Sequence, residues 1–164
     1  MVKGVGAVRM RQLLDFFGSA EIAWNAPAEG LKSAGLPNKV VESFILMRDK
    51  VDLECVMGTL ETREISVLTI EDADYPRRLK EINQPPPLLY IKGSINIEDE
   101  WAVAVVGTRR VTPYGRQVAN ELALFFAQNG ITVVSGLARG EDAIAHQSAI
   151  RAGGRTIDDA WQRC

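Results

Sequence analysis

The stretch that decides the fold is residues 101–157, WAVAVVGTRRVTPYGRQVANELALFFAQNGITVVSGLARGEDAIAHQSAIRAGGRTI. It opens with an apolar run, Trp101–Val106, which is typical of a strand buried on both faces of a parallel sheet. The elements predicted to follow are a helix over 114–129, a buried strand over 131–134, a helix over 140–152 and the start of a strand at 155–157. This alternation predicts an α/β fold, namely the first half of a Rossmann-like doubly wound parallel sheet.

The residues before this stretch are expected to form a small bundle of short helices. Apolar spacing predicts a helix over 7–17 and a longer helix from about 39 to 63. Ahead of the first helix, the sequence KGVG at 3–6 is typical of the hairpin in a helix-hairpin-helix, whose backbone amides can hold a DNA phosphate. The secondary candidates for DNA contact here are Lys3, Gly4 and Gly6. A purely structural helical turn is the alternative.

The connecting region between the bundle and the decisive stretch has its own pattern. Its β-branched and apolar runs predict short strands at 65–69 and 88–91, with a short helix at 77–82 between them. The aromatic residues divide by pattern into two groups. Those on apolar faces, which are predicted core residues, are Trp24, Trp101, Phe125 and Phe126. Better candidates for exposed rings are Tyr75, Tyr90 and Tyr114.

Composition and charge are those of an ordinary globular protein. The chain has 164 residues, of which 46% are hydrophobic and 24% charged, and its formal net charge is −2. It contains neither the apolar core of a signal peptide nor a run long enough to span a membrane, so we expect a cytoplasmic protein without membrane contact. Cys55 and Cys164 lack metal-ligand spacing, so no metal site and no disulfide framework are expected.

The type of charge changes along the chain. Between 42 and 74, nine acidic residues face three basic ones, whereas every cation between 104 and 157 is an arginine. An arginine presents a planar fork of donors that can grip a phosphate through two hydrogen bonds. The C-terminal arginines therefore suit phosphate contact, although a solvated surface that happens to use arginine explains the same count.

The first candidate site is the loop that leaves the strand over 101–106. Its candidate DNA- or phosphate-binding residues are Gly107, Thr108, Arg109 and Arg110, with Tyr114 as a further contact. In open α/β sheets, ligands bind outside the carboxyl ends of the strands, where loop amides and helix N-termini attract anions. The loop has neither dinucleotide-fingerprint spacing nor a Walker A ending, so it predicts phosphate binding without a nucleotide motif. An ordinary loop with solvated arginines is the alternative.

The second candidate loop follows the strand over 131–134, and we expect its tip to lie beside the first loop. Its candidate binding residues are Ser135, Gly136 and Arg139. Asp142 and His146 follow four residues apart, on one helix face, and are predicted to orient this loop. Ser135, Asp142 and His146 are also the residue types of a hydrolase triad. Without the G-x-S-x-G spacing, we expect no catalysis.

Short motifs recur in a recognisable order along the chain. They are FGS at 17–19, DYP at 74–76, PPPLLY at 85–90, VVGTR at 105–109, TPYG at 112–115, SGLARG at 135–140, His146 and GGRTI at 153–157. In this order they resemble the DprA/Smf family of DNA-processing proteins over about residues 4–157. The VVGTR and SGLARG loops in tandem are the most specific part of the resemblance.

The resemblance implies a fold, a role and a set of site residues. The implied domains are a SAM-like/helix-hairpin-helix domain at 1–63 and part of an extended Rossmann domain at 64–157. The implied role is a homodimeric, non-enzymatic protein without cofactors that binds single-stranded DNA and loads the RecA recombinase in natural transformation and recombination. The residues it assigns to the DNA pocket are Gly107, Thr108, Arg109, Ser135, Gly136 and Arg139.

Two departures from the family pattern bear on function. Glu141 stands where the family usually has an apolar residue, immediately before Asp142. Residues 158–164 resemble nothing in the family, which continues through further strands at that point, so we expect an incomplete sheet, a compromised homodimer and weakened binding. The alternative from another class is a Rossmann-type nucleotide-binding protein or an enzyme that acts on a nucleoside phosphate.

Overall fold

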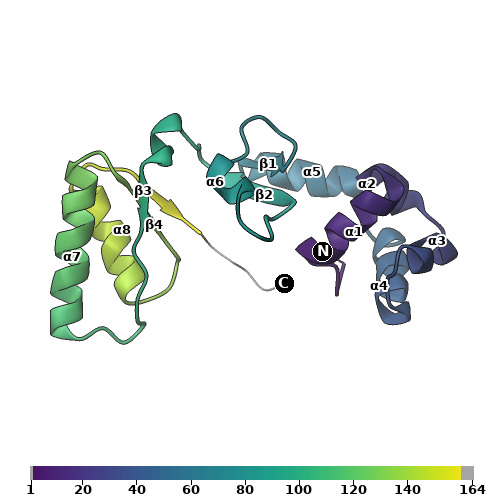
Figure 1. The fold of residues 1–164 in the computed structure, drawn as a ribbon, viewed down its shortest axis with the longest axis horizontal. Helices are drawn as coiled ribbons and strands as arrows, with labels where there is room; N and C mark the ends of the chain where they lie inside the picture. The colour runs from purple at the N-terminus through teal and green to yellow at the C-terminus, as the bar shows by residue number, and fades with distance from the viewer. Residues whose placement is uncertain (1, 160–164) are drawn as a thin grey trace. The chain divides into compact units, whose positions relative to one another are not determined.

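The computed structural model describes residues 2–159, and its contacts divide the chain into two compact units, 1–94 and 95–164 (Figure 1). Residues 64–94 belong to the first unit by contact, and the expected family-domain boundary between 63 and 64 stays a prediction. Within the described range, no helix is long and apolar enough to cross a membrane. Most of the expected tail, 160–164, lies outside the described residues.

The first unit begins with five helices, of which the first four supply a small apolar core. They are α1 (Ala7–Phe17), α2 (Ala20–Asn25), α3 (Ala28–Ser33), α4 (Asn38–Arg48) and α5 (Leu53–Thr62), so the helix expected over 7–17 is confirmed. Leu13 of α1 and Leu31 of α3 are fully buried, and the Trp24 and Phe44 rings pack with their centroids 5.5 Å apart. Ser19 caps α2, because its hydroxyl accepts from the Ile22 amide at 3.1 Å.

The single helix expected over 39–63 is wrong, because the structure has two helices there. α4 ends at Arg48, and α5 begins at Leu53. The carboxylate of Asp52 accepts from two amides of the first turn of α5, at 2.9 and 3.1 Å. A side chain that satisfies otherwise unpaired amides stabilises a helix start, and the apolar spacing alone does not reveal this break.

Two antiparallel strands complete the first unit. β1 (Ile65–Thr69) pairs with β2 (Leu88–Lys92), and α6 (Arg77–Lys80) lies in the connection between them, which confirms both expected strands. The expectation of an exposed Tyr75 ring is wrong. Tyr75 is buried, and its hydroxyl donates to the Pro86 carbonyl at 2.6 Å, so the ring closes the β1–β2 connection.

The second unit is a three-stranded parallel sheet with two helices. Its elements are the 3-10 helix η1 (Ile97–Glu100), β3 (Ala102–Ala104), α7 (Pro113–Gln128), β4 (Thr132–Ser135), α8 (Glu141–Arg151) and β5 (Thr156–Asp158). The strand order is β3-β4-β5, and both pairs are parallel. This confirms a mixed α/β fold with a parallel sheet and the expected alternation of strands and helices.

α7 and α8 pack against each other beside the sheet (Figure 1). Both crossovers move along the sheet in the same direction, so the two right-handed connections place both helices on the same face. The seam between the helices and β4 is built from small side chains. The alanines buried there are Ala123, Ala127, Ala145 and Ala149. Small residues let the helices approach closely without voids.

The expectation that the run over 101–106 is buried on both faces is wrong. In the described part of the chain, β3 is an edge strand and the helices lie on one face of the sheet; Trp101 and Val106, which flank β3, are exposed. Phe125 is also exposed rather than in the core, because it lies two residues from buried Ala123 and so on the opposite side of α7. Trp24 and Phe126 do pack against buried clusters.

A buried carboxylate joins the ends of three elements in the second unit. The Asp99 oxygens accept from the Arg155 guanidinium at 2.6 and 2.9 Å and from the Thr132 hydroxyl at 2.8 Å. The Asn96 amide donates to the same carboxylate at 2.8 Å. Burial raises the pKa of Asp99, but these hydrogen bonds and the charge of Arg155 outweigh it and lower the pKa below its ordinary value.

The first prediction concerns Asp99→Asn. The pKa of Asp99 is lower in the folded than in the unfolded chain, so its stabilisation is present above the unfolded pKa, about pH 4, and is lost as the pH falls through the folded pKa. We expect the wild type to be more stable than Asp99→Asn by about 2 kcal/mol at pH 7. Urea unfolding followed by circular dichroism at several pH values measures this difference.

Glu121→Gln is the matched control, because this substitution also removes one negative charge and Glu121 is exposed on α7. The difference between wild type and Asp99→Asn should shrink below pH 4, while Glu121→Gln stays close to wild type throughout. A constant difference between wild type and Asp99→Asn from pH 7 to pH 2 would contradict the role given to this carboxylate.

Candidate nucleic-acid interface

Two loops meet at the carboxyl edge of the parallel sheet. The first loop (105–112) joins β3 to α7, and the second loop (136–140) joins β4 to α8. The Glu141 amide, at the start of α8, donates to the Thr108 carbonyl at 3.2 Å. The two loops therefore lie side by side, as their positions after neighbouring parallel strands predict.

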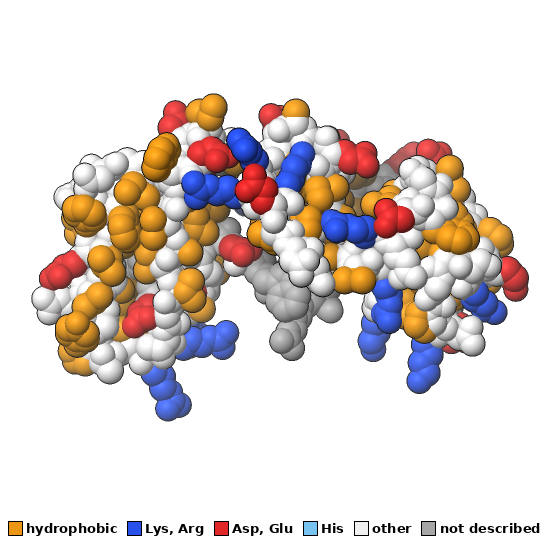
Figure 2. Space-filling view, viewed as in Figure 1, with side chains coloured by type: hydrophobic (Ala, Val, Ile, Leu, Met, Phe, Trp, Pro, Cys, Tyr) orange, Lys and Arg blue, Asp and Glu red, His pale blue; other side chains and the backbone are white. Residues whose placement is uncertain are grey.

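The first loop presents backbone donors and two cations. The Thr108 hydroxyl accepts from the Arg110 amide at 3.1 Å and so closes a tight turn. The amides of Gly107 and Arg109 have no hydrogen-bond partner within residues 2–159. The side chains of Arg109 and Arg110 are exposed. Figure 2 shows Lys and Arg side chains projecting from the edge of this unit at which β3 runs into α7.

The second loop adds a run of unpaired amides beside a third cation. Across residues 136–139, no backbone amide has a hydrogen-bond partner in the described part of the chain. Arg139 is exposed. Unpaired backbone amides are hydrogen-bond donors that an anion can use. Ser135 has a structural role instead. It is buried, and its hydroxyl donates to the Val105 carbonyl at 2.6 Å, which ties the end of β4 to the end of β3.

His146 and Asp142 stand behind the second loop. The His146 ring contacts the Gly136 carbonyl through Nε2 at 3.2 Å and the Thr156 hydroxyl through Nδ1 at 2.7 Å. These contacts join the loop to β5, as an orienting role requires. Asp142 is only 5% exposed, and its Oδ1 has no hydrogen-bond partner among residues 2–159. Neither ring nitrogen of His146 contacts Ser135, so the three triad-type residues are not arranged as a triad.

Gly140 makes the close approach of the two loops sterically possible. Its φ of +99° is one that residues with a side chain rarely adopt. An added Cβ would overlap the Thr108 carbonyl oxygen and lie 2.8 Å from the Arg109 Cα. Both the backbone conformation and the contact therefore require glycine here.

The secondary candidates lie in different places. Lys3, Gly4 and Gly6 form the turn before α1 in the first unit, where Gly4 has a φ of +90° and its carbonyl accepts from the Arg9 guanidinium. Tyr114 belongs to the second unit and is 78% exposed in the first turn of α7, next to the first loop. The structure thus brings Tyr114, but not the N-terminal turn, into the same unit as the two loops.

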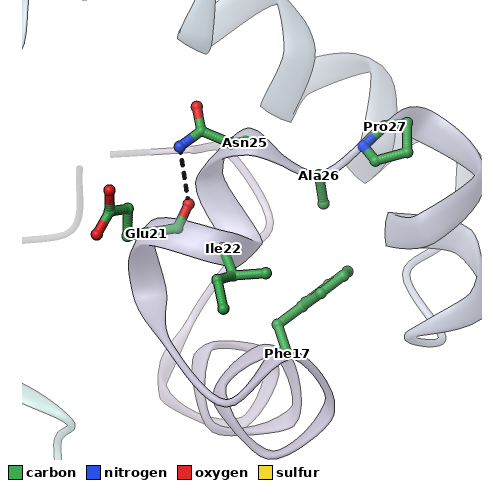
Figure 3. A pocket seen from close by; sticks show the side chains of 6 residues that line it. All are labelled: Phe17, Glu21, Ile22, Asn25, Ala26 and Pro27. Carbon is green, nitrogen blue, oxygen red and sulfur yellow. Dashed lines mark hydrogen bonds between the residues drawn. The ribbon is translucent and has the colours of Figure 1, made fainter.

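A hollow on the first unit differs in chemistry from the two loops (Figure 3). It has a volume of about 530 Å³ and is lined by Phe17, Glu21, Ile22, Asn25, Ala26 and Pro27. Its walls are mostly apolar, and its one charged side chain is the acidic Glu21. A negative charge in an apolar hollow does not suit a phosphate, so the anion-binding features remain those of the second unit.

The comparisons with known proteins decide the family. The sequence model of the family DNA recombination-mediator protein A matches residues 66–158. The chain belongs to this family. Among curated family relatives, the protein Smf of Synechocystis is 37% identical over 161 residues, which cover 95% of this chain and 40% of that protein. The DNA processing protein DprA of Bacillus subtilis is 34% identical over 128 residues, or 77% of this chain and 41% of that protein.

Solved structures of the family agree with the fold. DprA from Streptococcus pneumoniae superposes with a TM-score of 0.69 at 23% identity, over 97% of this chain and 54% of that chain. DNA processing protein A from Helicobacter pylori, described for its unique single-stranded DNA binding mode, is 37% identical with a TM-score of 0.51, over 59% of this chain and 42% of that chain. The chain spans about two fifths of the length of the curated relatives named above.

Two contributions to this region were missed by sequence reasoning. The Asp99–Arg155 pair, which holds the strand starts, gave no signal because its members lie far apart in the sequence. In the sequence, Glu141 is only a departure from the family pattern, whereas in the structure its carboxylate oxygen Oε2 accepts from the Thr108 amide at 3.0 Å. An acidic residue directly after a loop that is otherwise suited to phosphate is the signal that points to it.

The second prediction concerns Gly140→Ala. We expect it to reduce the free energy of unfolding by about 3 kcal/mol or more, because it adds an overlap to an unfavourable backbone conformation. Gly130→Ala is the control, since Gly130 also has a positive φ but faces open space, and it should lose only about 1 kcal/mol. Urea unfolding of both variants measures the two losses. Equal losses would show that the two loops are not held in close contact.

Proposed function

We propose that this chain binds single-stranded DNA through the two loops at the carboxyl edge of its sheet. The observation that carries the proposal is the run of unpaired amides next to three exposed arginines, Arg109, Arg110 and Arg139, at one edge of one unit. Backbone amides and arginines together are the usual partners of nucleic-acid phosphates. Family membership and the single-stranded DNA binding described for the Helicobacter pylori relative support the same conclusion.

The proposal favours a single strand with little base preference. Phosphate-directed donors position a nucleic acid but carry no sequence information. A strand without a partner also leaves its bases free to stack on an aromatic ring, and Tyr114 is the exposed ring next to the first loop. The proposed contacts are Gly107, Thr108, Arg109, Arg110, Gly136, Arg139 and Tyr114, with Ser135, Asp142 and His146 as positioning residues.

The finer fold assignment belongs to the same proposal. We assign residues 64–157 to part of an extended Rossmann domain, and the strand–helix alternation, the strand order and the loop positions of the second unit support this assignment. The helices of the first unit are assigned to a SAM-like/helix-hairpin-helix domain. The turn of residues 2–6 before α1 and the turn of residues 34–37 between α3 and α4 support this assignment.

The proposed cellular role is DNA processing in natural transformation and recombination, in which the bound strand passes to RecA in the cytoplasm. Homodimerisation and RecA loading come from the family likeness. Exposed aromatic residues on the second unit, Trp101 and Phe125, are the kind of surface that protein partners cover. Family membership favours this role over the alternative of a nucleotide-binding protein or nucleoside-phosphate enzyme.

The third prediction is that Arg109→Ala weakens binding to a labelled oligothymidylate about tenfold or more, because a charge-assisted contact to phosphate is lost. Arg77→Ala is the control, because this substitution also removes one positive charge and Arg77 is highly exposed in the first unit. Fluorescence anisotropy across a salt series measures both affinities, and affinity should fall steeply with salt.

A duplex of the same length completes this experiment. The wild type should bind the single strand more tightly than the duplex, and Arg77→Ala should match the wild type. Equal losses in Arg109→Ala and Arg77→Ala would indicate general charge rather than a site. Binding that favours the duplex would contradict the proposed function.

A further inference from the structure

A carboxylate of the protein itself occupies the position proposed for phosphate. The Glu141 oxygen Oε2 accepts from the Thr108 amide at 3.0 Å. A Cβ added at Gly107 would overlap this carboxylate, and one added at Gly115 would lie 2.8 Å from its Oε1. The Glu141 carboxylate therefore lies against the first loop and the first turn of α7. We call this space, bounded by Gly107, Thr108 and Gly115, the cradle.

The chemistry of the cradle suits an anion. The start of α7 contributes the positive end of its helix dipole, and the Thr108 amide points at the carboxylate. A carboxylate resembles one edge of a phosphate, since both present two negatively charged oxygens to a donor. The lack of side chains at Gly107 and Gly115 leaves room for either group. Glu141 is thus an internal anion bound in the place where a strand phosphate would bind.

We propose that Glu141 is an internal competitor of the DNA strand that lowers the affinity of the first loop for phosphate. The inference rests on the proposed function, because it concerns the same two loops. The strand phosphate and the Glu141 carboxylate cannot both accept from the Thr108 amide in one cradle. Binding therefore requires the Glu141 side chain to leave, and the measured affinity is the intrinsic affinity multiplied by the fraction of molecules in which the cradle is free of this side chain.

The contacts of Glu141 allow this exchange. Among residues 2–159, no Lys or Arg side chain forms an ion pair with its carboxylate. Its side chain accepts from the Thr108 amide and has no other hydrogen bond in the described part of the chain, while its backbone amide holds α8 to the first loop through the Thr108 carbonyl at 3.2 Å. The side chain can therefore leave by rotation without breaking the backbone contact that keeps the loops together.

A purely structural tie is the competing explanation, and it makes the opposite prediction. If the Glu141 carboxylate mainly holds the first loop in shape, its removal should loosen the loop and weaken DNA binding. If it competes with phosphate, its removal should open the cradle and strengthen DNA binding. Glu141→Gln and Glu141→Ala separate the two, because glutamine keeps the size and a hydrogen-bond acceptor while it removes the charge.

The fourth prediction is measured on the full chain with labelled oligothymidylate. We expect Glu141→Gln and Glu141→Ala to bind about tenfold more tightly than the wild type, as the loss of one competing charge-assisted contact implies. Glu121→Gln is the matched control, because Glu121 is exposed on α7, accepts only from Gln117 of its own helix at 2.9 Å, and should stay within about twofold of the wild type. Unfolding midpoints of all variants show whether each is folded at the assay temperature.

A second readout uses inorganic phosphate and does not depend on DNA. In a titration followed by amide resonances, phosphate should shift Thr108 at about tenfold lower concentration in Glu141→Ala or Glu141→Gln than in the wild type. The Gly130 amide, which lies in the turn after α7, serves as the internal reference. Only variants that are folded are titrated, and Glu141→Gln controls for side-chain size because glutamine is as large as glutamate.

The outcomes separate the inference from the proposed function. Tighter DNA binding by both Glu141 variants, with Glu121→Gln unchanged, supports the inference. If the wild type binds DNA and neither Glu141→Gln nor Glu141→Ala binds it more tightly, the inference is overturned and the proposed function remains intact. If no form of the chain binds DNA, the proposed function fails. The phosphate titration then decides alone, and an equal response of Thr108 in wild type and variants overturns the inference.

Discussion

The site depends on the contact between two backbones at Gly140. Because this residue has no side chain, the start of α8 can lie directly against the Thr108 carbonyl, and the two loops become one surface. The Ser135 hydroxyl reinforces this arrangement one layer deeper, where it bonds β4 to β3 through the Val105 carbonyl. Under the proposed function, arginines on separate loops reach the same strand of DNA only because these backbone contacts hold the loops together.

The features that sequence predicts well here are those with a local cause. The helix over 7–17 and the alternation after residue 101 follow from side-chain spacing, so the elements and the adjacency of the two loops were accessible in advance. The break before Asp52 was not accessible, because the apolar spacing continues across it and hides the start of a new helix that the Asp52 side chain caps. Trp101 was misplaced because apolar composition does not distinguish an edge strand from a central one.

The site itself was predictable in its residue types but not in its contacts. Arg109 and Arg139 could be named because they follow predicted strands, whereas the positions of Ser135 and Glu141 depend on which atoms they meet across the sheet. Long-range polar contacts such as the one between Asp99 and Arg155 leave no periodic trace. The sequence therefore predicts that the two loops lie side by side, and the structure adds which residues hold them there.

The alanine seam between α7 and α8 restricts how this unit can change in evolution. Ala123, Ala145 and Ala149 are completely buried, so any larger side chain there would have to push the helices apart and carry the loops with them. Neutral drift is therefore confined to the outer faces of the helices, where Leu122 and Phe125 are exposed. Descendants of this chain would retain the spacing of the helices while acquiring new partners on the surface that faces away from the sheet.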